Sequence, residues 1–141
     1  KPGGKLAFNT SFFEGAHPEE TLLFYRKWML KAARSLRKEY GLSPTRDSKV
    51  QSRKQLTAEE YAVLVETHGF RVERQEIDTV NVPIEGWLDI SSFKDFIEGV
   101  MPGVPLDKAS AALRTGVKDT FAEMKVNYIP RNWLDVVAVR V

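Results

Sequence analysis

Polar and aromatic side chains follow the first predicted strand of this 141-residue chain. The sequence Lys5–Phe12 has the composition of a strand, and Asn9, Ser11 and Phe12 stand at its carboxyl end. Ligands in open α/β sheets bind beyond the carboxyl ends of the strands. We therefore predict that Asn9, Ser11 and Phe12 contact a substrate. The alternative is that Asn9 and Ser11 hydrogen-bond the backbone of the turn that follows.

The chain has only two histidines, His17 and His68. His17 lies in the same loop, and an imidazole there could act as a base near neutral pH. The alternative for His17 is a surface position before Pro18. His68 lies in a predicted helix end, where a cation interacts favourably with the helix dipole. His17 is therefore the one candidate catalytic residue.

Two regions are rich in large apolar side chains that could line a pocket for an apolar molecule. The first region includes Tyr25, Trp28 and Met29. The second includes Trp87, Phe93, Phe96 and Met101. For each residue the alternative is an ordinary position in the core. Together the two regions favour an apolar substrate over a sugar or a nucleic acid. We predict that five of these residues bind substrate: Tyr25, Trp28, Trp87, Phe93 and Met101.

Composition narrows the classes of protein. The formal net charge is +2, hydrophobic residues make up 43%, and there is no cysteine. Disulfides, cysteine metal sites and a cysteine nucleophile are therefore excluded, and two distant histidines disfavour a metal site. The sequence has no uncharged run near the roughly 18 residues of a membrane span. These features fit a cytoplasmic protein that fills one ordinary domain.

The residues before the second predicted strand favour two helices with a loop between them. A long amphipathic helix is predicted from Pro18 to about Tyr40, with Gly41 as its C′ residue. The stretch 43–55 is polar and basic and is predicted to be a loop. Thr57 and Glu60 have the spacing of a capping box, which predicts a helix that ends near His68-Gly69.

The second half of the sequence favours two strands that flank two helices. A strand is predicted over Phe70–Ile77, continued or left by 80–83. A helix containing Phe93 and Val100 follows, capped by Asp89 or Ser91, and a second begins near Pro105. Pro130 is expected to separate that helix from a last strand, Trp133–Val141. Its segment 136–139 is apolar on both faces, which predicts a strand inside the sheet and covered on both sides.

Three motifs in this order resemble the C-terminal half of class I S-adenosylmethionine-dependent methyltransferases. Lys1-Pro2-Gly3-Gly4-Lys5-Leu6 resembles the turn that enters their fifth strand. The segment from Thr57 to Val72 resembles their next helix and sixth strand, and Asn132–Val141 is similar to their seventh strand. The resemblance implies an α/β fold: the C-terminal portion of a Rossmann-like sheet, with three strands of which the last is antiparallel and central.

The same resemblance implies a function and a division of the chain. Residues 1–141 are a single domain or a domain fragment, in which 13–56 is a helical insertion with a basic loop and 83–128 is a helical substrate-capping insertion. The cofactor is S-adenosylmethionine, and the acceptor is a small, apolar molecule. The family's glycine-rich cofactor loop has no counterpart in this sequence. We therefore expect an upstream cofactor-binding half of the same protein, without which this chain is inactive.

Two other functions stay open. The helical insertions could form a non-catalytic module that binds a hydrophobic ligand or a protein. The basic stretch 31–54 could belong to a nucleic-acid methyltransferase, although the low net charge and the lack of interleaved aromatic residues disfavour nucleic acid. The first strand, Lys5–Phe12, has no neighbour supplied by the sequence, and its edge could drive self-association into a homo-oligomer.

Overall fold

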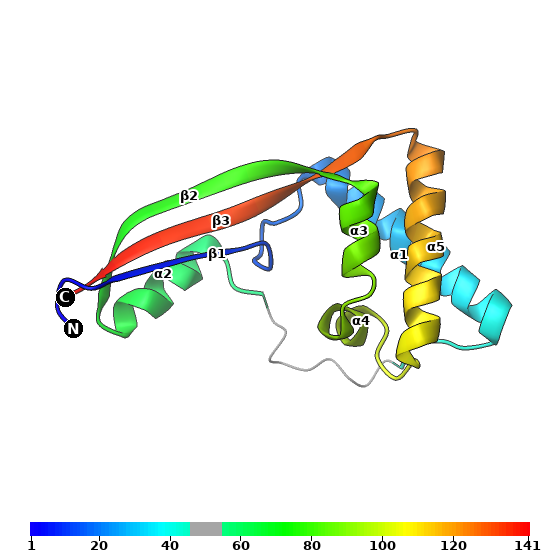
Figure 1. The fold of residues 1–141 in the computed structure, drawn as a ribbon, viewed down its shortest axis with the longest axis horizontal. Helices are drawn as coiled ribbons and strands as arrows, with labels where there is room; N and C mark the ends of the chain where they lie inside the picture. Colours follow the sequence, from blue (N-terminus) through cyan, green and yellow to red (C-terminus); the bar gives the residue numbers. More distant parts are fainter. Residues whose placement is uncertain (46–54) are drawn as a thin grey trace. The chain divides into compact units, whose positions relative to one another are not determined.

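A computed structural model describes residues 1–45 and 55–141 (Figure 1). These residues form three strands and five helices, so the fold is mixed α/β. The chain divides into two compact units. The described part of the sheet unit comprises residues 1–18, 55–80 and 130–141, and that of the helical unit comprises 19–45 and 81–129. The predicted loop cations Arg46, Lys49, Arg53 and Lys54 lie outside the described residues.

The three strands form one sheet in the order β1-β3-β2. They are β1 (Lys5–Thr10), β2 (Phe70–Pro83) and β3 (Tyr128–Arg140). Strand β3 runs antiparallel to β1, and the register pairs Lys5 with Val139 and Thr10 with Leu134. The prediction that the last strand is central and antiparallel to the first is confirmed. The β1 strand ends two residues earlier than predicted.

One face of the sheet is covered by α2 (Ala58–Thr67). The predicted capping box begins this helix: the Glu60 N–H donates to the Thr57 hydroxyl, and the Thr57 N–H donates to the Glu60 carboxylate, both at 3.1 Å. Ala58 and Tyr61 pack against the buried Leu134 and Val136 of β3. The capping box therefore fixes the start of a helix whose first turns cover the central strand.

The opposite face of β3 differs from the prediction. Val137 and Val139 are half-buried, whereas Val136 and Ala138 are almost completely buried. Successive side chains of a strand point to opposite faces, so the apolar run places two valines on the face that α2 does not cover. The strand is central, but its two faces are not equally covered.

Helices α1 (Glu19–Tyr40) and α5 (Leu106–Met124) are the long elements of the helical unit. They approach closely at Gly116, where an added Cβ would lie 3.0 Å from the Trp28 carbonyl oxygen and 3.1 Å from the Ala32 nitrogen. The Trp28 indole N–H donates to the Leu113 carbonyl at 2.8 Å. Gly41 has a φ of 63° and follows α1, which confirms the predicted C′ residue.

Aromatic side chains fill the core of the helical unit. The Phe24 and Trp87 rings lie 5.0 Å apart, and Trp28 stacks on Phe96 at 5.5 Å. Ring pairs at such distances add roughly 0.5–1.5 kcal/mol beyond the burial of their area. Met101 is buried in the same cluster. This core joins α1 to the segment that contains the second aromatic-rich region.

That second region contains two short helices rather than one. They are α3 (Ile84–Ile90) and α4 (Lys94–Val100). The expected cap at Asp89 or Ser91 is wrong, because Phe93 precedes α4 and no side chain caps it. The Ser91 hydroxyl instead donates to the Trp87 carbonyl at 2.7 Å, which satisfies a carbonyl at the end of α3. A serine near a helix boundary can serve either helix, and here it serves the preceding one.

The last strand is longer than the sequence indicates. Pro130 was expected to precede it, but β3 begins at Tyr128 and contains Pro130. Proline has a fixed φ that is compatible with extended backbone, although it offers no N–H to a neighbouring strand. The extra residues at the start of β3 bring Arg131 and Asn132 into the strand, with consequences for the loop after β1.

Candidate functional site

The loop after β1 is attached to β3 by Arg131. This side chain is buried, and its Nη2 donates to the Ser11 carbonyl at 2.8 Å. Its guanidinium carbon lies 5.1 Å from the centre of the Phe12 ring, a distance typical of a cation–π contact. Ser11 is 4% exposed and Phe12 is 50% exposed. Ser11 is therefore an anchor of the loop, and Phe12 presents its ring at the surface.

Asn132 attaches the remainder of the same loop. Its side-chain amide donates to the Gly15 carbonyl at 3.0 Å, and its backbone N–H donates to the Ala16 carbonyl at 2.8 Å. Its side-chain oxygen accepts from the Thr79 hydroxyl of β2 at 2.7 Å. All three strands thus contribute to one fixed loop at the carboxyl end of β1, which we call the β1 loop (residues 11–17).

His17 ends the β1 loop, and its pKa is lowered from 6.5 to about 4. Burial is the larger cause, and the positive charge of Arg131 is the second. The sequence favours a base that titrates near neutral pH. The environment instead holds a neutral imidazole at pH 7, which is a weak base.

Asn9 lies on β1 opposite Asp135 of β3 and is exposed. The pKa of Asp135 is raised, chiefly because its carboxyl shares a hydrogen bond with Asp78 and also through the charge of that neighbour. These three side chains therefore make a polar area on the sheet. It lies on the face of the sheet opposite to that of Phe8, whose apolar contacts are with α2.

Arg131 and Asn132 are the site residues that the sequence reasoning missed. Neither is marked by a motif, and both precede the strand as it was predicted. The signal that could identify them is the antiparallel pairing of the last strand with the first. In that arrangement the beginning of β3 must lie beside the end of β1, as the pair Thr10 and Leu134 does.

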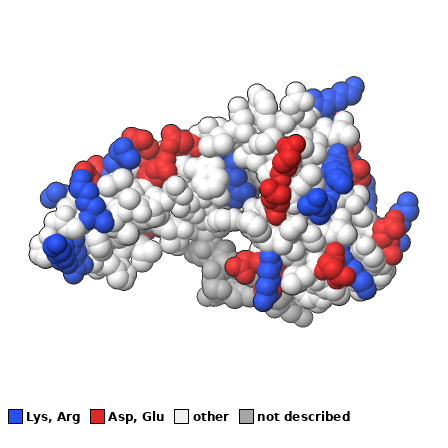
Figure 2. Space-filling model, viewed as in Figure 1, with Lys and Arg blue, Asp and Glu red and all other residues white. Residues whose placement is uncertain are grey.

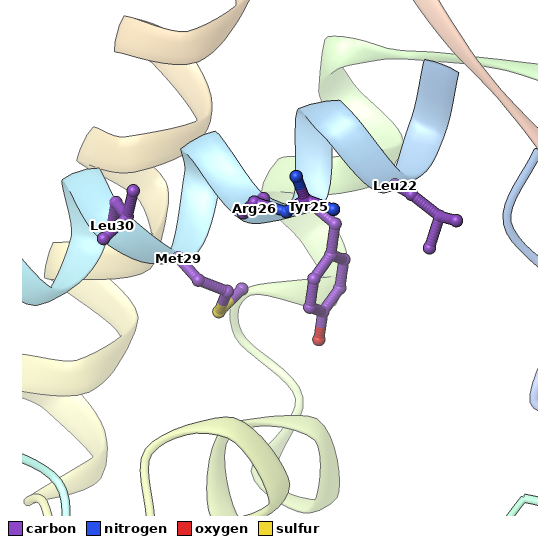
Figure 3. A pocket seen from close by; sticks show the side chains of 5 residues that line it. All are labelled: Leu22, Tyr25, Arg26, Met29 and Leu30. Atoms are coloured by element: carbon purple, nitrogen blue, oxygen red, sulfur yellow. The ribbon is translucent and has the colours of Figure 1, made fainter. Parts of the chain in front are cut away.

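A pocket of about 480 Å³ lies along α1 in the helical unit (Figure 3). Its lining comes from one side of the helix: Leu22, Tyr25, Arg26, Met29 and Leu30. Tyr25 and Met29 extend in the same direction in this view, Leu22 and Leu30 lie to either side of them, and Arg26 lies between them. The pocket is shallow and open to solvent, since these side chains all belong to one helix, and its lining is mostly apolar.

The other predicted substrate residues lie in the helical unit but outside this pocket. Trp28, Trp87 and Met101 are at most 2% exposed and belong to its core. Phe93 is 61% exposed at the start of α4. Of the five aromatic and methionine residues predicted to bind substrate, Tyr25 alone lines the pocket. Asn9, Ser11, Phe12 and His17 belong to the sheet unit.

The charged side chains are mixed on the face drawn in Figure 2. Lys and Arg alternate there with Asp and Glu and do not form a continuous basic area. On α1, Lys27 and Lys31 both bind the Glu123 carboxylate, at 2.8 and 3.1 Å.

Within residues 1–45 and 55–141, no helix has the length and hydropathy that a bilayer span requires. In the same residues no three acidic or histidine side chains are grouped as metal ligands.

Comparison with known proteins adds no family assignment. Neither a protein-family profile nor a curated protein matches the sequence. The functional conclusion therefore depends on the order of the strands and on the two places described above, the β1 loop and the α1 pocket.

Proposed function

We propose that this chain is the C-terminal part of a class I S-adenosylmethionine-dependent methyltransferase that acts on a small, apolar acceptor. The observation that carries the proposal is the sheet order β1-β3-β2, with β3 antiparallel to β1. A last strand inserted between two earlier strands is what the resemblance implies for the end of such an enzyme. The helix α2 between β1 and β2, with its capping box, supports the same assignment.

The cofactor itself does not fit the residues present here. The sequence contains no Gly-x-Gly-x-x-Gly motif. The glycines before β1 form a turn, in which the Gly4 N–H donates to the Lys1 carbonyl at 3.1 Å, and they lead into a strand rather than a helix. Phosphate and carboxylate groups are held by backbone N–H groups at helix N-termini. We therefore assign no residue of this chain to the cofactor.

The proposed part of this chain in the reaction is to position the acceptor. Methyl transfer is a one-step displacement, and holding the reacting groups in line can supply much of its rate. The β1 loop is suited to this because Arg131 and Asn132 fix its backbone. Phe12 offers an apolar surface to such an acceptor. A general base is needed only if the acceptor must lose a proton.

Methyl transfer from labelled S-adenosylmethionine tests this proposal. The product of the complete reading frame is incubated with a panel of small apolar alcohols, acids and amines, and the label is counted in the organic extract. We expect transfer to at least one acceptor. We expect Phe12→Ala to raise its KM and Tyr128→Ala, a similarly exposed aromatic outside the β1 loop, to leave the KM unchanged. No transfer to any acceptor, together with no binding of the cofactor, contradicts the proposal.

A second candidate function is a non-catalytic module that binds a hydrophobic ligand. The α1 pocket favours it, because its lining comes from one helix and needs no cofactor. Ligand binding by a complete reading-frame product that neither binds S-adenosylmethionine nor transfers methyl groups supports this alternative.

A further inference from the structure

The α1 pocket combines exposed leucines with an arginine. Leu22 is 48% exposed and Leu30 is 55% exposed. They lie on the same row of the helix as Arg26, at intervals of four positions, and neighbours at this spacing share one face. Tyr25 and Met29 make the adjacent row. The pocket is therefore a strip of apolar surface with a guanidinium group at its middle (Figure 3).

Arg26 differs from the lysines next to it. Lys27 and Lys31 share the single carboxylate of Glu123, whose pKa is lowered by hydrogen bonds from those two lysines. Within the described part of the chain, no acidic residue pairs with Arg26. The lining itself contains no Asp or Glu. An anionic group placed in the pocket would thus meet a positive charge without competition from a carboxylate.

We propose that the α1 pocket binds a small organic anion with an apolar body, such as a carboxylate, sulfonate or phosphate ester of an aromatic or short aliphatic molecule. The anionic group binds Arg26, and the apolar body lies on the side chains of Leu22, Met29 and Leu30. The leucines are separated by about 12 Å along the helix axis, from eight residues at 1.5 Å each. A guanidinium can donate two parallel, charge-assisted hydrogen bonds to such an anionic group.

This inference goes beyond the proposed function and does not depend on it. The β1 loop, which is proposed to position the methyl acceptor, belongs to the sheet unit, whereas the α1 pocket belongs to the helical unit. Binding itself needs neither the cofactor nor methyl transfer. A binding experiment without cofactor therefore tests the pocket separately from the enzyme activity.

Two fluorescent probes with nearly the same apolar body test the pocket. Anilinonaphthalene sulfonate carries a negative charge, and N-phenylnaphthylamine lacks the sulfonate. We expect saturable binding of the anionic probe to the full chain. Arg26→Gln is expected to lower the affinity for the anionic probe about tenfold and to leave the affinity for the neutral probe unchanged. Loss of a hydrogen bond between charged groups lowers an affinity by about this factor. Leu30→Gln is expected to weaken both probes.

Arg34→Gln is the matched control, because Arg34 is an exposed arginine of the same helix outside the pocket. This variant should bind both probes with the affinity of the wild-type chain. Equal loss in Arg26→Gln and Arg34→Gln would overturn the proposal and indicate general attraction of anions to α1. Binding to anionic phosphatidylglycerol vesicles without binding of the free probe would also overturn it, in favour of a lipid surface.

Methionine methyl NMR locates the probe, because the chain has only three methionines. Met29 lines the pocket, whereas Met101 is buried in the core of the helical unit. The expected result is a shift of the Met29 signal on titration with the anionic probe and an unchanged Met101 signal. A probe that shifts Met101 and leaves Met29 unchanged contradicts the assignment. Unchanged circular dichroism of each variant shows that the fold is retained.

Discussion

His17 should make the stability of the protein depend on pH in a defined window. In the folded chain burial and the Arg131 charge lower the pKa of His17 from 6.5 to about 4. The unfolded chain therefore binds more protons than the folded chain between these values. Stability from this group is fully present above pH 6.5, is lost as the pH falls toward 4, and changes no further below that.

The magnitude follows from the size of the pKa change. A drop from 6.5 to about 4 corresponds to about 3.4 kcal/mol. Because the imidazole keeps part of its exposure to water, solvent screening reduces this to roughly 2 kcal/mol. Substitution of Arg131 by Met should raise the pKa of His17 but leave it below 6.5, since burial is the larger cause.

Urea unfolding at a series of pH values measures this effect. The difference in the free energy of unfolding between the unchanged chain and His17→Gln should decrease by roughly 2 kcal/mol from pH 7 to pH 4. Carboxylates titrate in the same range, but they are common to both proteins and cancel in the difference. NMR of the imidazole protons in His68→Gln, which leaves His17 as the one histidine, gives its pKa directly. A pH-independent difference, or a His17 pKa near 6.5, would mean that the folded structure does not lower the pKa of His17.

Three further substitutions test the packing, a helix cap and a carboxyl pair. Gly116→Ala should lower the free energy of unfolding by about 2 kcal/mol despite the better helix propensity of alanine, because the new Cβ meets the backbone of α1. The control Thr115→Ala changes an exposed residue of the same helix and should not destabilise the protein. A Gly116→Ala variant that is more stable than the wild type would be inconsistent with the close approach of the two helices. Thr57→Ala should cost about 1 kcal/mol in urea unfolding, and no loss would mean that the capping box does not stabilise α2. Asp78→Asn should lower the pKa of Asp135 and raise the melting temperature more at pH 7 than at pH 4, and equal shifts would argue against an interaction between the two carboxyl groups.

The sequence predicts those elements whose signals are local. The capping box of Thr57 and Glu60 and the glycine after α1 each depend on residues within one or two helical turns. The central position of β3 was expected from its apolar run and from the resemblance, and it is confirmed, but the equal coverage of both faces that the run predicts is not found.

The features that the sequence does not reveal depend on contacts between distant residues. Ser91 could cap either of two helices, and it caps α3 because its hydroxyl donates a hydrogen bond to the Trp87 carbonyl. The roles of Arg131 and Asn132 depend on the register between β1 and β3, which pairs residues more than 120 positions apart. Likewise, helical spacing alone does not show that Trp28 faces the core and Tyr25 the pocket.

Titration with S-adenosylmethionine determines whether the cofactor binds to this protein and to which part of it. Calorimetry is performed in parallel on the product of the complete reading frame and on residues 1–141 alone. We expect saturable, stoichiometric binding by the complete product and none by residues 1–141, because no residue of this chain is assigned to the cofactor. Absence of binding by the complete product would contradict the methyltransferase assignment, and saturable binding by residues 1–141 would contradict the division of the site between the two parts.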